Sequence, residues 1–219
     1  MKDIFIFGAS GHAKVVMDIV ETSGKYHIKY LIDDSLHLKG MSIYGYPVLG
    51  NREDLKTQAQ EHQIHEGIIA IGNNQIRAAI EQWCLSHHLE LVTAVHSSAQ
   101  ISRSVQINAG TVVMAGAVIN PDTKIGRNAI INTQASIDHE CSIEDWVHIG
   151  PGATICGNVH IGEYSLIGAG STILPNLKIG KQVTVGAGTT ITRDVPDYVT
   201  MVGTPAKRIR SKEEPPNKP

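Results

Sequence analysis

The most regular feature of the chain is a six-residue repeat of branched apolar side chains that starts at Val95. Seventeen consecutive repeats begin with Ile or Val, without an insertion or a slip in phase. The fifth residue of each repeat is small or apolar, and the second is often Gly or Asn. A period of six fits neither an amphipathic helix nor an alternating strand, and it is a known signature of β-helices. The pattern therefore predicts a prism of short strands and corners.

Each position of the repeat has an expected place in this prism. The first residue should point inward, and the fifth should fill the corner beside it. Glycines at the second position, such as Gly126 and Gly150, are expected to take the special dihedral angles of the bends. Three repeats would close one triangular coil, so seventeen make nearly six coils spaced roughly 4.8 Å apart. An ice-binding or purely structural solenoid is disfavoured because the outer face is irregular and carries His, Glu, Asp and Asn.

Upstream of the repeat, short apolar runs alternate with helical periods. The expected strands are Ile4–Phe7, Ile28–Ile32, Gly67–Ile71 and Leu89–Val95, with a short extended piece at Pro47–Leu49. The expected helices are Ala13–Glu21, with Val15, Val16, Ile19 and Val20 on its apolar side, Arg52–Gln63, and Gln75–His88, with Ile76, Ala79, Ile80, Trp83 and Cys84 inward. Strands that alternate with helices predict a small, mostly parallel, Rossmann-like α/β sheet.

The change of pattern divides the chain into domains. We expect an α/β domain at residues 1–94, a β-helix at 95–210 and a flexible tail at 211–219. The net charge of −2 gives no electrostatic reason to expect nucleic acid or a membrane as partner. No run approaches eighteen apolar residues, and the first residues lack a signal-peptide pattern. The three cysteines form neither a metal spacing nor an even disulfide framework, which indicates a cytoplasmic protein.

Small and acidic residues follow three of the expected strands of the α/β domain. Because ligands of parallel sheets bind beyond the carboxyl ends of the strands, we expect these residues to line one crevice. A helix that starts in a Gly-rich loop suits the phosphates of a nucleotide. Position 10 is Ser, so the loop is not a full G-x-G-x-x-G, and a tight turn without a ligand stays an alternative. The crevice residues are Ser10, Gly11, His12, Asp33, Asp34, Gly72 and Asn73.

One repeat differs from the others because its corner holds a histidine followed by a glutamate, His139 and Glu140. A corner histidine projects outward, and an imidazole that titrates near neutral pH can take up and release a proton. A neighbouring carboxylate can orient such a ring and stabilise its charged form. The alternative is that both residues are solvated corner side chains.

Six motifs give the chain a resemblance to a known family. They are GASGHAKVV at 8–16, LIDD at 31–34, IAIGNNQIR at 69–77, INTQASIDHEC at 131–141, Gly-Asn-Val at 157–159 and VGTPAKRI at 202–209. Together they resemble the sialic-acid O-acetyltransferases and nucleotide-amino-sugar N-acetyltransferases, a branch of the hexapeptide acyltransferases. The resemblance implies a left-handed β-helix, acetyl-CoA as co-substrate, and homotrimers with active sites between neighbouring prisms.

The resemblance also implies roles for single residues. His139 would be the general base, with Glu140 orienting it, and Asn132 would lie near the acceptor sugar. His148 would contact acetyl-CoA near the thioester, and Gly157 would let a backbone N–H approach the thioester oxygen as an oxyanion donor. For Asn132 a left-handed corner residue is the alternative, and for His148 a surface histidine. Two third-position residues one coil apart would stack along one edge and offer backbone groups to the pantetheine arm; these are Ala169 and Ala187.

The implied reaction is acetylation of the 4-amino group of a nucleotide-linked deoxy-amino sugar for a surface glycan, with UDP favoured over GDP. O-acetylation of sialic acid is the second enzymatic interpretation, and a non-catalytic sugar-nucleotide scaffold is the interpretation from another class. A zinc site like that of the γ-class carbonic anhydrases is disfavoured, so no metal is expected. Its candidate ligands occupy different positions of the repeat and form no single column; they are His96, His139, His148 and His160.

Overall fold

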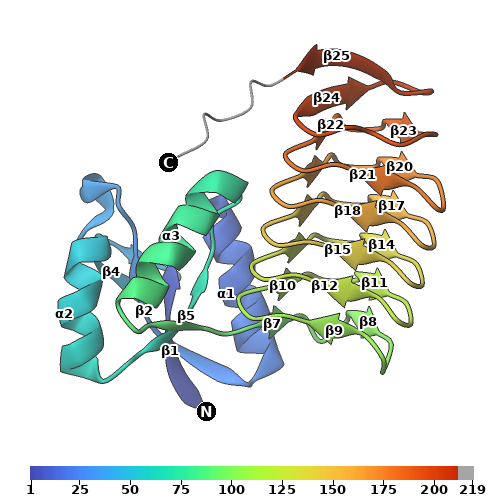
Figure 1. The fold of residues 1–219 in the computed structure, drawn as a ribbon. Helices are drawn as coiled ribbons and strands as arrows, with labels where there is room; N and C mark the ends of the chain where they lie inside the picture. Colours follow the sequence, from blue (N-terminus) through green and yellow to red (C-terminus); the bar gives the residue numbers. More distant parts are fainter. Residues whose placement is uncertain (212–219) are drawn as a thin grey trace.

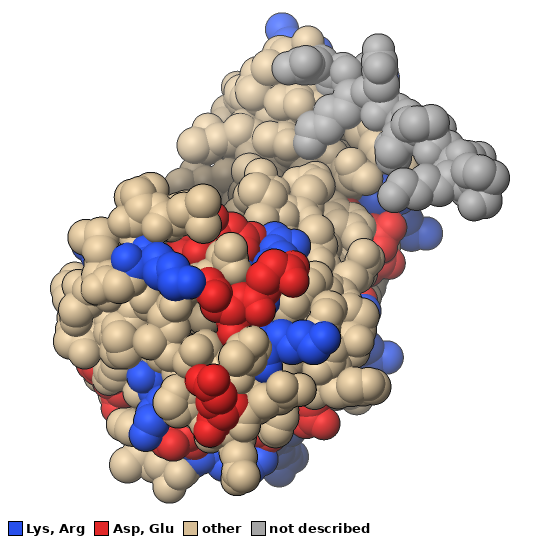
Figure 2. Space-filling view, turned by 90° about the vertical axis from the view of Figure 1, so that its left-hand side faces the viewer, with Lys and Arg blue, Asp and Glu red and all other residues tan. Residues whose placement is uncertain are grey.

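The computed structural model describes residues 1–211, so the predicted flexible tail lies, apart from Ser211, outside the described residues. An α/β domain stands beside a three-sided prism, as Figure 1 shows. Acidic and basic side chains are interspersed over the α/β domain in the view of Figure 2, where Lys and Arg form no continuous patch.

The α/β domain is built on a six-stranded sheet in the order β3-β4-β2-β1-β5-β6, parallel except for the β3–β4 pair. Its strands are β1 (Lys2–Phe7), β2 (Tyr26–Ile32), β3 (Ser42–Ile43), β4 (Tyr46–Gly50), β5 (Glu66–Ile69) and β6 (Glu90–Leu91). Its helices are α1 (Gly11–Ser23), α2 (Arg52–His62) and α3 (Asn74–Ser86), with a 3-10 turn η1 (Leu36–Leu38).

Strand β1 shows how the sheet separates two layers of core. Side chains alternate along a strand, so Ile4 and Ile6 face one side and Phe5 and Phe7 the other. The isoleucines pack with α1 and with residues of the prism, including Ile130. The phenylalanines pack in a separate cluster with side chains from α2 and α3. Helix α1 therefore lies between the sheet and the prism.

Three expectations for this domain are wrong in detail. In α3, Ile76 and Ala79 are exposed, and the buried side of the helix carries polar residues as well as Ala78, Ile80 and Cys84. In α1, Val15 is exposed while Val16, Ile19 and Val20 are buried. The expected strand Leu89–Val95 is two short strands, because the chain leaves the sheet after β6 and enters the prism at β7. The expected fold class, an α/β domain followed by a left-handed β-helix, is confirmed.

The prism contains seventeen two-residue strands within residues 94–191. They are β7 (Ala94–Val95), β8 (Gln100–Ile101), β9 (Gln106–Ile107), β10 (Val112–Val113), β11 (Val118–Ile119), β12 (Lys124–Ile125), β13 (Ile130–Ile131), β14 (Ser136–Ile137), β15 (Ser142–Ile143), β16 (His148–Ile149), β17 (Thr154–Ile155), β18 (His160–Ile161), β19 (Leu166–Ile167), β20 (Thr172–Ile173), β21 (Lys178–Ile179), β22 (Thr184–Val185) and β23 (Thr190–Ile191). An antiparallel pair follows them, β24 (Val199–Val202) and β25 (Lys207–Ser211).

Every third strand of the prism belongs to the same parallel sheet, so the prism has three faces. The domain face contains β7, β10, β13, β16, β19 and β22, continued by β24 and β25; the second face contains β8, β11, β14, β17, β20 and β23; the third contains β9, β12, β15, β18 and β21. Helix α1 packs on the domain face, in one apolar cluster with Ala94, Val112 and Ile130. The first-position residues from Val113 to Ile191 are at most 2% exposed, as expected for a filled interior.

The bends of the prism differ from the expectation in one respect. In the repeats that begin at Ile107 to Val185 the left-handed residue is the fourth, for example Asn128, Glu140 or Asn158, and not the second. Glycine at the second position is required by space instead. A Cβ on Gly168 would lie 2.6 Å from the backbone nitrogen of Ala187 in the next coil. The glycines thus allow the coils to stack closely at these corners.

Candidate active site

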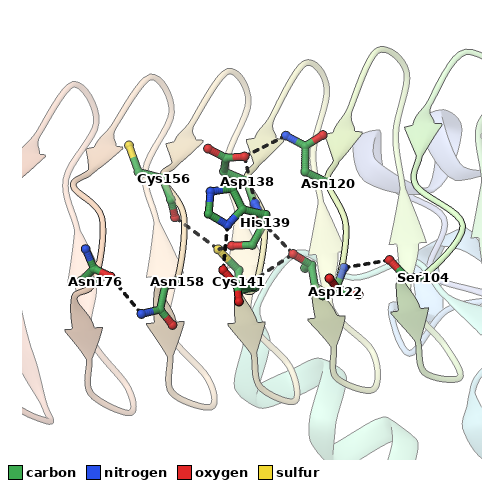
Figure 3. Close-up of polar contacts among 11 residues, drawn as sticks. Ser104, Asn120, Asp122, Asp138, His139, Cys141, Cys156, Asn158 and Asn176 are labelled. Carbon is green, nitrogen blue, oxygen red and sulfur yellow. Dashed lines mark hydrogen bonds and ion pairs between the residues drawn. The ribbon is translucent and has the colours of Figure 1, made fainter.

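The corner between the second and third faces carries His139, on the turn from β14 to β15. The backbone N–H of His139 donates to Asp138 Oδ1 at 2.9 Å, and the same oxygen accepts from Asn120 Nδ2 at 2.9 Å (Figure 3). These two hydrogen bonds hold the pKa of Asp138 below its ordinary value, and the bond from the His139 backbone has the larger effect. The backbone under the imidazole is therefore fixed by a charged acceptor.

Glu140 contacts the imidazole because it occupies the left-handed position of the turn, with φ of 59°. Neighbouring residues of a strand point apart, and the left-handed backbone turns the second side chain toward the first. His139 Nδ1 lies 3.0 Å from Glu140 Oε2, with side chains that are 55% and 64% exposed. A carboxylate at Nδ1 favours the tautomer with the proton on Nδ1, which leaves Nε2 as the nitrogen that can accept a proton.

Gly157 lies one coil beyond His139, and the imidazole is packed over its Cα atom. A Cβ on Gly157 would stand 2.7 Å from both Cε1 and Nε2 of the ring. The same corner position holds Pro121 in the coil before His139 and Pro175 in the coil after Gly157, so a side chain is compatible with this corner elsewhere. The missing side chain of Gly157 thus provides the space in which the His139 ring lies.

A second group of predicted residues lies on the domain face. Asn132 Nδ2 is 3.1 Å from His148 Nε2, and Asn132 Oδ1 accepts the N–H of Thr133 at 2.8 Å. Asn132 has no left-handed backbone, so that interpretation of the residue is wrong. Burial, reinforced by the positive charge of Arg77, lowers the pKa of His148 to about 4. The imidazole of His148 is therefore neutral and accepts the Asn132 amide.

His12 joins this group from the first turn of α1. Burial lowers its pKa to about 4, helped by the nearby His148 and Arg77. Its Nε2 is buried and has no hydrogen-bond partner among residues 1–211. Two neutral imidazoles and one amide thus meet where the α/β domain touches the prism.

The two aspartates after β2 are engaged within the α/β domain. Asp33 accepts the backbone N–H groups of Ala9 and Ser35, at 2.8 and 2.9 Å, and so holds the Gly-rich loop. Asp34 pairs with the guanidinium of Arg52, Nε to Oδ2 at 2.9 Å. Burial opposes ionisation of Asp34, but the hydrogen bonds from Arg52 outweigh it and hold the pKa below its ordinary value.

The Gly-rich loop itself opens onto a cleft of about 380 Å³ lined by Ser10, Gly11, Lys14 and Tyr44. Ser10 makes no side-chain cap at the start of α1, so the first N–H groups of the helix lie beside this cleft without a serine cap. Such a helix start attracts anions.

The loop after β5 brings Gly72 and Asn73 to the prism. The side chain of Asn73 caps α3 by accepting the N–H of Ile76 at 3.0 Å. Both residues line a small cleft of about 120 Å³ with Tyr164 and Thr184 of the prism. This cleft joins the end of β5 to the domain face.

Ala169 and Ala187 are exposed on the corner between the domain face and the second face, one coil apart. The carbonyl of Ala169 accepts the N–H of Gly188 at 2.8 Å, so one of its two backbone groups already serves the prism.

The structure therefore places the predicted residues in two groups that one chain does not bring together. His12, Asn132 and His148 lie on the domain face. His139 and Glu140 lie on the corner between the other two faces, across the prism from it. A histidine base and a crevice for an acceptor can form one site only if two copies of the chain meet.

Within residues 1–211 no group of three or more His, Cys, Asp or Glu side chains is placed to hold a metal ion. His160, one of the considered ligands, instead pairs with Glu144 at 3.2 Å on the third face. No helix in the described part of the chain has the length and apolar character needed to cross a membrane.

Comparison with known proteins agrees with both domains. Residues 3–83 match the PglD N-terminal domain, and residues 122–157 and 158–193 match the bacterial transferase hexapeptide (six repeats). UDP-N-acetylbacillosamine N-acetyltransferase of Bacillus subtilis (strain 168) is 35% identical over 114 residues, 51% of each protein. The match thus spans about half the length of that curated relative.

Solved structures match over nearly the whole chain. PerB from Caulobacter crescentus, in complex with CoA and GDP-perosamine, is 36% identical with a TM-score of 0.90, covering 96% of this chain and 98% of that one. The acetyltransferase domain of PglB from Neisseria gonorrhoeae FA1090, in complex with acetyl coenzyme A, is 36% identical with a TM-score of 0.87, covering 95% and 99%.

The chain belongs to the hexapeptide-repeat acetyltransferases of nucleotide-linked amino sugars. The predicted family and enzyme class are thereby confirmed. Within this family fold, the roles of the single site residues rest on the geometry given above.

Sequence reasoning missed the buried polar residues of α3, above all Arg77 and Glu81, which are 1% and 3% exposed. Charged residues are rarely buried, so hydrophobic periodicity gives no reason to expect Arg77 and Glu81 inside. A signal was nevertheless present, because Asn74, Arg77, Glu81 and Cys84 recur at helical spacing on one face.

Proposed function

We propose that the protein transfers the acetyl group of acetyl-CoA to the 4-amino group of a nucleotide-linked deoxy-amino sugar, in the synthesis of a surface polysaccharide or glycan. A UDP-linked sugar is the first candidate and a GDP-linked sugar the second, since relatives of both kinds are similar to this chain. Acetyl-CoA and sugar nucleotides are both made in the cytoplasm, where we place the reaction.

The observation that carries the proposal is the exposed His139–Glu140 pair at a corner of the prism, with Nδ1 at the carboxylate. As the sugar amine attacks the thioester carbonyl, Nε2 of His139 takes one proton from the nitrogen. A new C–N bond forms, the C–S bond breaks, and the CoA thiolate leaves and is protonated. Glu140 stabilises the imidazolium while it carries the proton. No covalent acetyl-enzyme is needed.

The sugar nucleotide is proposed to bind in the crevice of the α/β domain. A helix start beside the cleft at Ser10 and Gly11 suits its phosphates. The buried, unpartnered Nε2 of His12 is a polar atom that a sugar or phosphate oxygen could satisfy. Asp33 and Asp34 would face the ribose or base, and Asn132 the acceptor sugar.

We further propose a homotrimer in which the His139 corner of one prism meets the domain face of its neighbour. The separation of the two residue groups within one chain supports an arrangement in which copies of the chain meet. His148, Gly157, Ala169 and Ala187 would then border the groove that holds acetyl-CoA between two prisms. A heterologous interface closed by rotation gives such a ring.

The test is a thiol-release assay with acetyl-CoA and three sets of acceptors: UDP-amino sugars, GDP-amino sugars and free sialic acids. We expect release with a nucleotide-linked 4-amino sugar and an amide product by mass spectrometry. Acetylation of a sialic acid hydroxyl instead would establish O-acetylation. Release with none of the acceptors, from a protein that still binds sugar nucleotides, would establish a scaffold and refute the proposal.

A further inference from the structure

Arg77 is the most deeply buried charged residue of the contact between α3 and the prism, with 1% of its surface exposed. Burial lowers its pKa to about 9, against the opposing effect of the Glu81 carboxylate, so the guanidinium keeps its charge at neutral pH. Burying a charge is costly unless hydrogen bonds satisfy it. The hydrogen-bond partners of the Arg77 side chain therefore indicate its role in the fold.

The guanidinium donates to five acceptors from three segments of the chain. In the prism it reaches the carbonyls of Asn128, at 2.8 Å, and Trp146, at 3.0 Å. In the loop after β5 it reaches the carbonyls of Ile71, at 2.9 Å, and Gly72, at 3.2 Å. In α3 it reaches Oδ1 of Asn74, at 2.9 Å. A planar fork of five N–H donors suits this task, and a lysine offers only three donors from one point.

The Gly72 carbonyl connects Arg77 with the residues of the crevice. It also hydrogen-bonds the ring of His148. Since Nε2 of His148 faces the Asn132 amide at 3.1 Å, Nδ1 is the nitrogen that donates to Gly72. The amide of Asn132 is in turn held by the N–H of Thr133. One chain of hydrogen bonds thus runs from Arg77 through Gly72 and His148 to Asn132.

We infer that Arg77 is a positioning residue: it fixes the Gly72 carbonyl, and through it the His148 tautomer and the direction of the Asn132 amide toward the acceptor sugar. This inference rests on the proposed function for its substrate, a nucleotide-linked amino sugar. Arg77 acts without touching that substrate, because it is covered by α3 and the prism. Its effect on catalysis comes from the order that it gives to three groups in the crevice.

The first experiment compares Arg77→Lys and Arg77→Met with Arg127→Lys in the full-length protein. Arg127 lies on the same contact, 3.5 Å from the Glu81 carboxylate, but its side chain is 42% exposed and it is outside the Arg77 chain of hydrogen bonds. We expect KM for the sugar nucleotide to rise about tenfold or more in both Arg77 variants. KM for acetyl-CoA should rise less, because His148 borders the acetyl-CoA groove while the Asn132 amide at the end of the chain of hydrogen bonds serves the sugar alone. Arg127→Lys should leave both KM values within about twofold.

A merely structural role of Arg77 predicts another result. The variants would then show a lower melting temperature and less active protein, with both KM values unchanged. That outcome, or an equal rise in both KM values, would overturn the inference.

The second experiment needs no variant at Arg77 and tests the contact between Gly72 and His148, which the inference requires, even if those proteins do not fold. Nitrogen-15 NMR of the wild-type histidines, with His148→Gln for assignment, reports which ring nitrogen carries the proton. We expect His148 at pH 7 as the neutral tautomer protonated on Nδ1; the Nε2–H tautomer or a charged ring would overturn the inference. A wild-type protein that acetylates no sugar nucleotide would refute the proposed function. The NMR experiment would still report the His148 tautomer, because it needs no substrate.

Discussion

Three neighbours hold the His139 imidazole, each by a different physical means. Asp138 accepts the backbone N–H of His139, Glu140 binds Nδ1, and Gly157 leaves space for the ring. The His139 side chain nevertheless stays 55% exposed. A small side chain on a narrow corner thereby gains the fixed orientation that a general base needs.

The first prediction concerns the base itself. His139→Asn removes the proton acceptor and should lower kcat by roughly 10²–10⁴, with little change in either KM. Steady-state kinetics with acetyl-CoA and the preferred acceptor measure the effect. A variant that keeps near wild-type turnover would remove His139 from the mechanism.

The second prediction concerns Gly157. Gly157→Ala introduces a Cβ 2.7 Å from two atoms of the imidazole, in the space that the ring occupies. The backbone of Gly157 is not left-handed, so it can carry a side chain without strain. We expect kcat to fall roughly 10–100-fold from the displaced base, at an almost unchanged melting temperature.

The double variant His139→Asn/Gly157→Ala is the control for this prediction. It should be no slower than His139→Asn alone, because Gly157→Ala acts through the ring. An additional loss in the double variant would mean that Gly157 acts independently, for example by donating its N–H to the thioester oxygen.

At the scale of elements, each coil of the prism depends on its inward branched residue. Ile155→Ala, on β17, should lower the free energy of unfolding by about 2–5 kcal/mol, since a buried isoleucine is replaced by a cavity. Thr154→Ala, on the outer side of the same strand, should change it by no more than about 0.5 kcal/mol. Urea unfolding at fixed protein concentration measures both, and similar losses would contradict the inward assignment.

The prism could be predicted because its period is visible in the residue types themselves. An inward Ile or Val at every sixth position is compatible with a β-helix and with no other regular fold. Residue composition does not show whether the second or the fourth position of the repeat takes the left-handed conformation. Glu140 and Trp146 occupy that bend as readily as Asn128, so residue type gives no clear signal there.

The contact between α3 and the prism could not be predicted in the same way. Hydrophobic periodicity assigns Ile76 inward, yet the helix meets the prism through Asn74, Arg77 and Glu81. A polar contact between two domains leaves no apolar stripe in the sequence. For the same reason the link from Arg77 to His148 becomes visible only in the structure.

At the scale of the whole molecule, the junction between domain and prism contains two neutral histidines. The pKa values of His12 and His148 are near 4 when folded and near 6.5 when unfolded. Below about pH 6.5 the unfolded chain binds protons that the folded protein does not, so stability falls as the pH is lowered toward 4 and is unaffected by these groups above 6.5.

Each histidine should contribute a slope of at most about 1.4 kcal/mol per pH unit within that window. Replacing His12 by Asn should therefore flatten the dependence of unfolding free energy on pH between 7.5 and 5. Identical pH dependence in the variant and the wild type would show that His12 is not buried in its neutral form.

In the proposed trimer, a base on one prism serves a crevice on another copy of the chain. The most direct measurement mixes two variants, His139→Asn and His12→Asn, each expected to be nearly inactive alone. Random assortment into trimers pairs an intact His139 with a neighbour's intact His12 at about a quarter of the sites, so co-expression should restore about a quarter of the wild-type activity. Mixed trimers that stay as inactive as their parents would contradict the claim.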